Sequence, residues 1–317
     1  IRLPARKKAL SVIYTLRGTA YAGLGDYDKA LEDHAEAIRL NPKYEEAYNS
    51  RAIIYHNLGQ LDNAVEDYTK AIELAVELKK KSNEALALYN RGIVFFDKRE
   101  YERAVGDFTE AIRLMPEFAE AYSFRGMIYS KLGIKEKATV DFTKALQFNP
   151  EYREAYFNRG LVYLDHKEYD KAIDDFTNAI KLNSSDPEVY NNRGIAYSEK
   201  EEFDKAIMDF SQAIKLNPDF EKAYFNRGNC HHKIKEHQKA IDDFSDVLRL
   251  NPKDAEGLYW RGVSYFHKWE NEKSILDLKK AVDLGHGEAR KFLKKYFNID
   301  YKKKIFVAAA TNKAIII

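Results

Sequence analysis

Residues 155–183 read AYFNRGLVYLDHKEYDKAIDDFTNAIKLN, and the Arg159-Gly160 pair near the start of this stretch recurs along the chain. The recurrences are Arg17-Gly18, Arg91-Gly92, Arg125-Gly126, Arg193-Gly194, Arg227-Gly228 and Arg261-Gly262, with Arg51-Ala52 in the one gap. Six of the seven intervals between these arginines are 34 residues long. A fixed period of this length is typical of a helical hairpin copied along a chain, in which each copy buries an apolar face against its neighbour.

Eight repeats result when each copy is counted from seven residues before the Gly position. Their boundaries are 11–44, 45–84, 85–118, 119–152, 153–186, 187–220, 221–254 and 255–288. The second repeat has six extra residues near 74–82, so we expect its second helix to overrun and the next turn to be displaced. Residues 1–10 are expected to lengthen the first helix, residues 287–298 to form a capping helix, and residues 299–317 to form an extended apolar and basic tail.

The residues within each repeat follow two helical patterns. Position 8 is Gly in seven copies, positions 4 and 11 are mostly aromatic, positions 20 and 27 are small, and position 24 is a ring such as Phe176. Spacings of three and four place positions 4, 8 and 11 on one helix face, and positions 20, 24 and 27 on another. The two faces predict a hairpin. Pro at position 32 in five copies is expected to end its second helix.

These columns resemble the signature of the tetratricopeptide repeat family, which has a large residue, Gly and Tyr on a first helix, then Ala, Phe and Pro on and after a second. The resemblance covers residues 11–288. It implies an all-α fold, a right-handed superhelical solenoid of antiparallel helix pairs with a C-terminal capping helix. It also implies a scaffold that binds other proteins.

Composition agrees with a helical chain that stays in water. Apolar residues make up 45% and charged residues 32%, with mean hydropathy −0.58, and no apolar run approaches the length of a membrane span. Lysines gather near the C-terminus, but no basic stripe follows the repeats, so we expect no nucleic-acid partner. The lone Cys230 excludes an internal disulfide and fits the cytosol or a periplasm, with the cytoplasm preferred. Ile1, without a leader sequence, indicates a processed or trimmed chain.

Every repeat also has Arg at position 7 and Asp at position 23, as in Arg125 and Asp141. Both positions lie at the edges of the inward faces, where a charge is costly unless it is paired. We therefore predict a structural ladder of ion pairs, and the alternative is an arginine row for an acidic ligand. The sequence leaves open whether each pair forms within one repeat or between neighbours.

Positions 5, 6, 9 and 12 of the first helices form a second surface, which lines the concave groove in tetratricopeptide superhelices. Apolar residues there need a partner to cover them, although packing between neighbouring first helices accounts for part of the pattern. The predicted peptide-binding residues are Tyr89, Asn90, Ile93, Phe96, Phe157, Asn158, Leu161, Asn192, Ile195, Phe225, Asn226, Asn229 and Tyr259.

Asparagine at position 6 resembles the asparagine ladder of O-linked N-acetylglucosamine transferases, which implies pairing with a peptide backbone. Leu16, Ser50, Phe124 and Trp260 interrupt this column, and the alternative is an Asn merely tolerated on a helix surface. A carboxylate clamp fits less well, since only Lys222, Asn226 and Asn229 echo it. Position 2 is mostly acidic, which favours a basic or neutral ligand.

We predict no catalytic residue, no cofactor and no metal ion. The one soft-ligand cluster, Cys230-His231-His232 with His237, lies on neighbouring helix positions that diverge by about 100°. The expected function is a protein–protein interaction scaffold that binds an extended peptide or a helix of a partner in its groove. The alternatives are a regulatory or substrate-recruiting segment of a larger enzyme, and an assembly protein that self-associates, with the C-terminal tail as the contact.

Overall fold

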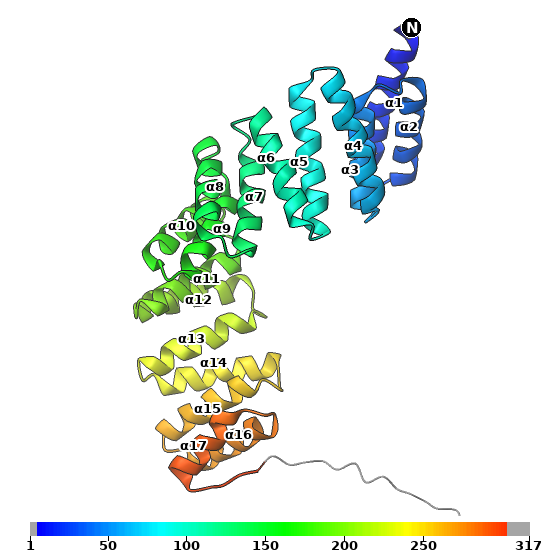
Figure 1. Ribbon diagram of the computed structural model, residues 1–317. Helices are drawn as coiled ribbons and strands as arrows, with labels where there is room; N and C mark the ends of the chain where they lie inside the picture. Colours follow the sequence, from blue (N-terminus) through cyan, green and yellow to red (C-terminus); the bar gives the residue numbers. More distant parts are fainter. Residues whose placement is uncertain (1–4, 303–317) are drawn as a thin grey trace, which may run out of the picture. The chain divides into compact units, whose positions relative to one another are not determined.

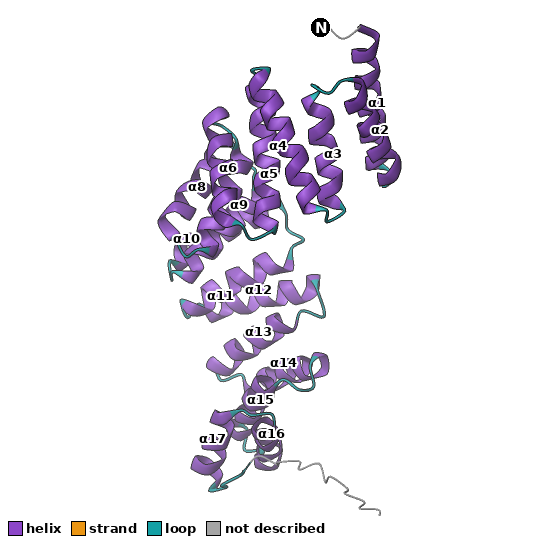
Figure 2. Ribbon diagram, turned by 45° about the vertical axis from the view of Figure 1, so that its right-hand side comes forward, coloured by secondary structure: helices purple, strands orange, loops and turns teal. Residues whose placement is uncertain are grey.

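The computed structural model describes residues 5–302, and every regular element in that range is an α-helix (Figure 1). The all-α repeat solenoid expected from the sequence is confirmed. The chain divides into two compact units between Val162 and Tyr163, within α9 (Arg153–Asp165). Short loops join the helices throughout (Figure 2).

The first unit is a series of helix pairs, each made of a first and a second helix. It comprises α1 (Ala5–Gly23), α2 (Tyr27–Leu40), α3 (Glu45–Asn57), α4 (Leu61–Glu77), α5 (Lys81–Asp97), α6 (Tyr101–Leu114), α7 (Ala119–Lys131), α8 (Lys135–Phe148) and most of α9. The extra residues of the second repeat lengthen both α4 and α5 to 17 residues each. They leave only a short turn, in which Lys79 has a left-handed φ of 55°.

The second unit continues the pairs and ends in a single helix. It comprises α10 (Tyr169–Leu182), α11 (Pro187–Glu199), α12 (Phe203–Leu216), α13 (Glu221–Lys233), α14 (His237–Leu250), α15 (Ala255–His267), α16 (Asn271–Asp283) and α17 (Gly287–Phe297). Helix α17 covers the last pair, with Ala289 and Leu293 fully buried. Tyr301 follows it and donates a hydrogen bond from its hydroxyl to Asp283 at 3.1 Å. The rest of the predicted tail, residues 303–317, lies outside the described residues, and so does the expectation that it is extended and mediates self-association.

A ring against a glycine forms the centre of most helix pairs, such as α5–α6 and α11–α12. The position-24 side chains, such as Phe108 and Phe210, are 0% exposed. A Cβ added at Gly92 would lie 2.8 Å from Phe108 Cε1, and one at Gly194 would lie 2.7 Å from Phe210 Cε1. Position 8 therefore must be small, because the ring of its own repeat occupies the space of a side chain.

Five of the second helices, α2, α8, α10, α12 and α14, end at an Asn C-cap rather than at Pro. Helix α12 ends with Asn217 as its C-cap, directly before Pro218 at position 32. Helix α10 ends in the same way at Asn183, where the chain has no proline. The Asn183 side chain accepts the backbone N–H of Ser185 at 2.9 Å, a local turn that replaces the helical pattern. Proline accompanies this stop but is not required for it.

The predicted ion-pair ladder is present, and its pairs form within one repeat. Arg125 contacts Asp141 through two hydrogen bonds of 2.8 Å each. The same pairing joins Arg17 to Asp33, Arg51 to Asp67, Arg91 to Asp107, Arg193 to Asp209, Arg227 to Asp243 and Arg261 to Asp277. Because their guanidinium groups are engaged, these arginines do not form a free row for an acidic ligand.

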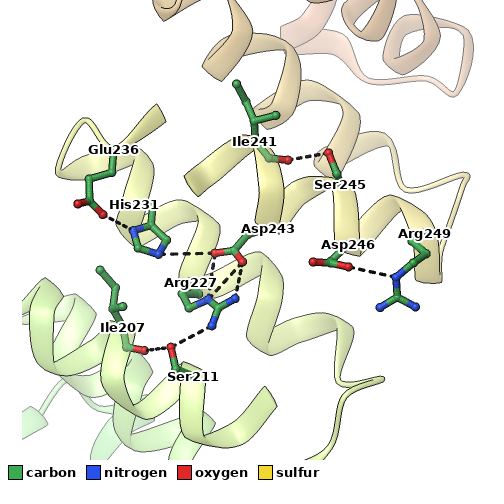
Figure 3. A network of polar contacts seen from close by, with 10 residues as sticks. All are labelled: Ile207, Ser211, Arg227, His231, Glu236, Ile241, Asp243, Ser245, Asp246 and Arg249. Carbon is green, nitrogen blue, oxygen red and sulfur yellow. Dashed lines mark hydrogen bonds and ion pairs between the residues drawn. The ribbon is translucent and has the colours of Figure 1, made fainter. Parts of the chain in front are cut away.

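A hydroxyl of the preceding repeat completes six of these rungs, from Arg91 to Arg261. Arg227 donates from Nη2 to Asp243 at 2.6 Å and from Nη1 to Ser211 Oγ at 2.9 Å (Figure 3). Ser211 in turn donates to the carbonyl of Ile207 at 2.7 Å. The ladder therefore ties the third to eighth repeats each to the one before it. The sequence carried a signal for this link, a column of Ser or Thr at position 25: Thr69, Thr109, Thr143, Thr177, Ser211 and Ser245.

Candidate functional site

All thirteen predicted peptide-binding residues lie on first helices of the pairs, and each is partly buried. They do not form one uniform surface. Those of the first unit mostly pack against neighbouring side chains, whereas most of those in the second unit line cavities.

In the first unit, the aromatic residues contact rings of their own repeat and of the next one. The Tyr89 ring centroid lies 4.8 Å from that of Phe118 and 5.7 Å from that of Phe124. Burial raises the pKa of Tyr89 above its ordinary value. Ile93 and Phe96 pack against the same apolar cluster. Packing therefore accounts for Tyr89 and Ile93, whereas Phe96 also lines a separate cavity of about 460 Å³.

Phe157, Asn158 and Leu161 lie on α9 and are partly buried. They line neither of the cavities described below. Tyr259 on α15 lies at the end of the second unit, with its ring stacked on His286 at 4.4 Å between centroids. Its ring is therefore covered by the segment that precedes α17.

Two neighbouring cavities open along α11, α13 and α15 in the second unit. The first, which we call the acidic cavity, has a volume of about 500 Å³. Four of its lining side chains are carboxylates, and the others supply a ring, an aliphatic group, amides and one ammonium. They are Glu188, Asn191, Asn192, Ile195, Glu221, Lys222, Phe225, Asn226, Asp254 and Glu256.

The second cavity, which we call the tryptophan cavity, has a volume of about 450 Å³. It is lined by Ile195, Ser198, Glu199, Glu201, Phe203, Phe210, Asn226, Asn229, His232, Lys233 and Trp260. Ile195 and Asn226 belong to both cavities, which are therefore contiguous. Together they contain five of the predicted residues, namely Asn192, Ile195, Phe225, Asn226 and Asn229.

The asparagine column makes hydrogen bonds between repeats. Asn226 donates from Nδ2 to Oδ1 of Asn191 in the preceding repeat at 3.0 Å, and Asn90 makes the equivalent bond to Asn49 at 3.2 Å. Asn192 instead donates to the carbonyl of Glu188 at 2.8 Å. Part of the hydrogen-bonding capacity of these asparagines is therefore used within the solenoid.

Several charged residues at the acidic cavity already have partners. Glu256 accepts the indole N–H of Trp260 at 3.0 Å through Oε1, and its Oε2 lies 2.8 Å from His286 Nε2. Asp254 caps α15, accepting the backbone N–H of Glu256 at 3.0 Å through Oδ1. Among residues 5–302, neither the Glu188 carboxylate nor the Lys222 ammonium has a hydrogen-bonded or ion-paired partner.

Histidines from three helices meet beside the tryptophan cavity. The ring centroid of His232 lies 5.2 Å from that of His237 and 5.5 Å from that of His267. Burial lowers the pKa of His232 to about 4, and the two nearby imidazoles add to this shift. His232 is therefore neutral near pH 7, with its Nδ1 lying 3.1 Å from the Ser264 hydroxyl.

No group of three metal-ligating side chains with suitable geometry occurs within the described range. Cys230 is buried, with its thiol 3.4 Å from the Ser198 hydroxyl, and His231 contacts Glu236 and Asp243 (Figure 3). Between residues 5 and 302, none of the helices has both the length and the apolar character needed to cross a bilayer.

Most of the residues that line these cavities were not among the predicted peptide-binding residues, and Trp260 and Asn191 are two of those that were missed. Trp260 was identified only as an interruption of the asparagine column, yet it lines the tryptophan cavity. Asn191, which is 3% exposed, holds Asn226 in place. A signal for Asn191 was present, because Asn at position 5 precedes Asn at position 6 of the next repeat in both Asn49–Asn90 and Asn191–Asn226.

Family models for tetratricopeptide repeats match most of the chain. One matches residues 119–152, 154–186, 187–220 and 221–254, a second matches 44–117 and a third matches 18–59.

Solved structures show the same fold. YrrB, described as a TPR protein with an unusual peptide-binding site, is 27% identical with a TM-score of 0.54 over 59% of this chain and 97% of its own. The MamA protein is 25% identical with a TM-score of 0.51, over 57% of this chain and 97% of its own. A tetratricopeptide repeat protein from Parabacteroides merdae is 23% identical with a TM-score of 0.56, over 79% and 97%. No curated protein matches this chain in sequence.

Proposed function

The chain belongs to the tetratricopeptide repeat family of protein-interaction scaffolds, and we propose that its second unit binds an extended segment of a partner protein in the acidic and tryptophan cavities. The segment would lie across α11, α13 and α15, with its backbone near Asn226 and its side chains in the two cavities.

The contiguity of the two cavities carries this proposal. A segment of two or three extended residues spans about 7–10 Å, so consecutive side chains on one side of it can enter neighbouring cavities. Phe225 and Ile195 provide apolar contact area, and the amides provide hydrogen bonds that fix the register. Such a combination binds a backbone and a few side chains together.

The similarity to YrrB supports the same kind of ligand. YrrB is described as having a peptide-binding site, and its likeness to this chain extends over nearly all of its own length. The first unit offers weaker support, because Tyr89, Ile93 and Phe96 are engaged in packing between repeats.

Selection from a displayed library of random twelve-residue peptides tests the proposal. The best binder is then synthesised with a fluorescent label, and its affinity is measured by anisotropy. We expect Phe225→Ala and Asn226→Ala each to weaken binding about tenfold, since both side chains line the acidic cavity.

Asn90→Ala is the matched control. Asn90 makes the same inter-repeat bond as Asn226 but lies in the first unit, so its loss should leave the affinity unchanged. Circular dichroism confirms that each variant keeps its helices. Binding that is insensitive to both Phe225→Ala and Asn226→Ala would contradict the proposal.

A further inference from the structure

We propose that the acidic cavity selects a partner segment that carries a lysine or arginine side chain, and this inference rests on the proposed function. The cation would contact the carboxylates of Glu188 and Asp254 while its apolar stem lies against Phe225.

The lining of the acidic cavity is negatively charged overall. Four carboxylates and one ammonium line it, so its formal charge is −4 + 1 = −3. A cationic side chain lowers the repulsion between these carboxylates, whereas an anionic one raises it. The cavity therefore distinguishes ligands by the sign of their charge.

Two of these carboxylates remain available to a ligand. The Glu188 carboxylate has no ion-paired or hydrogen-bonded partner within residues 5–302, and Asp254 uses Oδ1 for the α15 cap. Glu256 has both oxygens occupied by Trp260 and His286. A cation contacting Glu188 and Asp254 Oδ2 therefore does not have to displace an existing hydrogen bond.

The acidic cavity also contains a hydrogen-bond donor that does not belong to an acidic residue. Asn191 is 3% exposed and lines the same cavity. Its Oδ1 accepts from Asn226, and its Nδ2 has no acceptor in the part of the chain that the structure describes. An unsatisfied donor facing a cavity is suited to a peptide carbonyl. This bond would hold the backbone beside the carboxylates.

The apolar lining completes the match to lysine or arginine. The Phe225 ring packs edge-on against Phe244 at 5.7 Å between centroids and also lines the cavity. Lysine and arginine have apolar stems that cover such a ring while their charged ends reach the rim. A metal cation or a short polar cation would leave this surface uncovered.

Three labelled ten-residue peptides test the inference by anisotropy at 25 mM salt. They share a Gly, Ala and Ser background and differ only in carrying three lysines, three glutamines or three glutamates. We expect the lysine peptide to bind at least about fivefold more tightly than the glutamine peptide, and the glutamate peptide to bind least. At 500 mM salt the difference should fall below about twofold.

The Glu188→Gln, Asp254→Asn double variant should reduce the preference for lysine to about twofold or less, while leaving the glutamine peptide unaffected. Asn can still cap α15, so the helix start is preserved. Glu272→Gln is the control, because Glu272 is exposed on α16 and lines neither cavity.

Equal binding of the lysine and glutamine peptides overturns the inference, as does a lysine peptide with no binding below 1 mM. A preference for lysine that survives the double variant also overturns it. If a library-selected peptide still loses affinity in Phe225→Ala, the proposed function stands while the charge selection fails.

Discussion

Replacing His34 with phenylalanine should remove an acid-sensitive weakness from the first helix pair. His34 occupies position 24, where six other repeats have a ring of Tyr or Phe, and it is 0% exposed. Both of its ring nitrogens are buried without a hydrogen-bond partner. Burial lowers the pKa of His34 to about 4 from 6.5, with Asp33 opposing the shift and Arg51 adding to it.

The direction of the pH effect follows from linkage. The native state prefers neutral His34, so its contribution to stability is fully present above pH 6.5 and is lost as the pH falls from 6.5 toward 4. With these two pKa values, the loss amounts to about 2 kcal/mol at pH 5 and approaches about 3 kcal/mol at lower pH.

Hydrogen exchange read by mass spectrometry reports the opening free energy of α1 and α2 directly. The difference between His34→Phe and the parent chain should grow by about 2 kcal/mol between pH 7 and pH 5, because all other titrating groups cancel in the comparison. Phenylalanine fits, since the same ring lies against a glycine in other repeats and Gly18 lies against His34 here. A difference that stays constant across this pH range would refute the reasoning.

Three further substitutions test the packing and the ladder by urea unfolding. Arg125→Leu leaves Asp141, which is 3% exposed, without its partner and should lower the free energy of unfolding by about 3–5 kcal/mol. Arg113→Leu breaks only an exposed pair with Glu110 and should change little, so equal effects would contradict a structural ladder. Gly194→Ala should destabilise the protein by about 1–3 kcal/mol, because the added Cβ would contact Phe210. Gly106→Ala has open space around it and should stabilise the protein slightly, and the opposite order would show that the Phe210 ring can move away. Ser211→Ala removes the hydrogen bonds to Arg227 and Ile207 and should lower the free energy of unfolding by about 1 kcal/mol more than Ser185→Ala at an exposed turn. No difference between the two variants would mean that the hydroxyl link is dispensable.

The amino-acid sequence alone determined the repeat period, the helix pairs and the inward faces. These features depend on contacts within one repeat, such as Gly194 against Phe210, where spacings of three and four suffice to show which side chains share a face. The Arg and Asp columns were equally visible. The sequence did not show whether each Arg pairs with the Asp of its own repeat or of a neighbouring one, because a helix pattern gives the face of a residue but not the neighbour across the hairpin.

Only the tertiary structure decided which groove residues are available to a ligand. Tyr89 and Phe225 occupy the same position of their repeats, yet Tyr89 packs against Phe118 and Phe124, whereas Phe225 lines a cavity. The difference arises from the side chains that neighbouring repeats supply, with rings around Tyr89 and amides and carboxylates around Phe225. Periodicity cannot reveal this, because exposure at an interface between repeats depends on the combined volume of side chains that are distant in sequence.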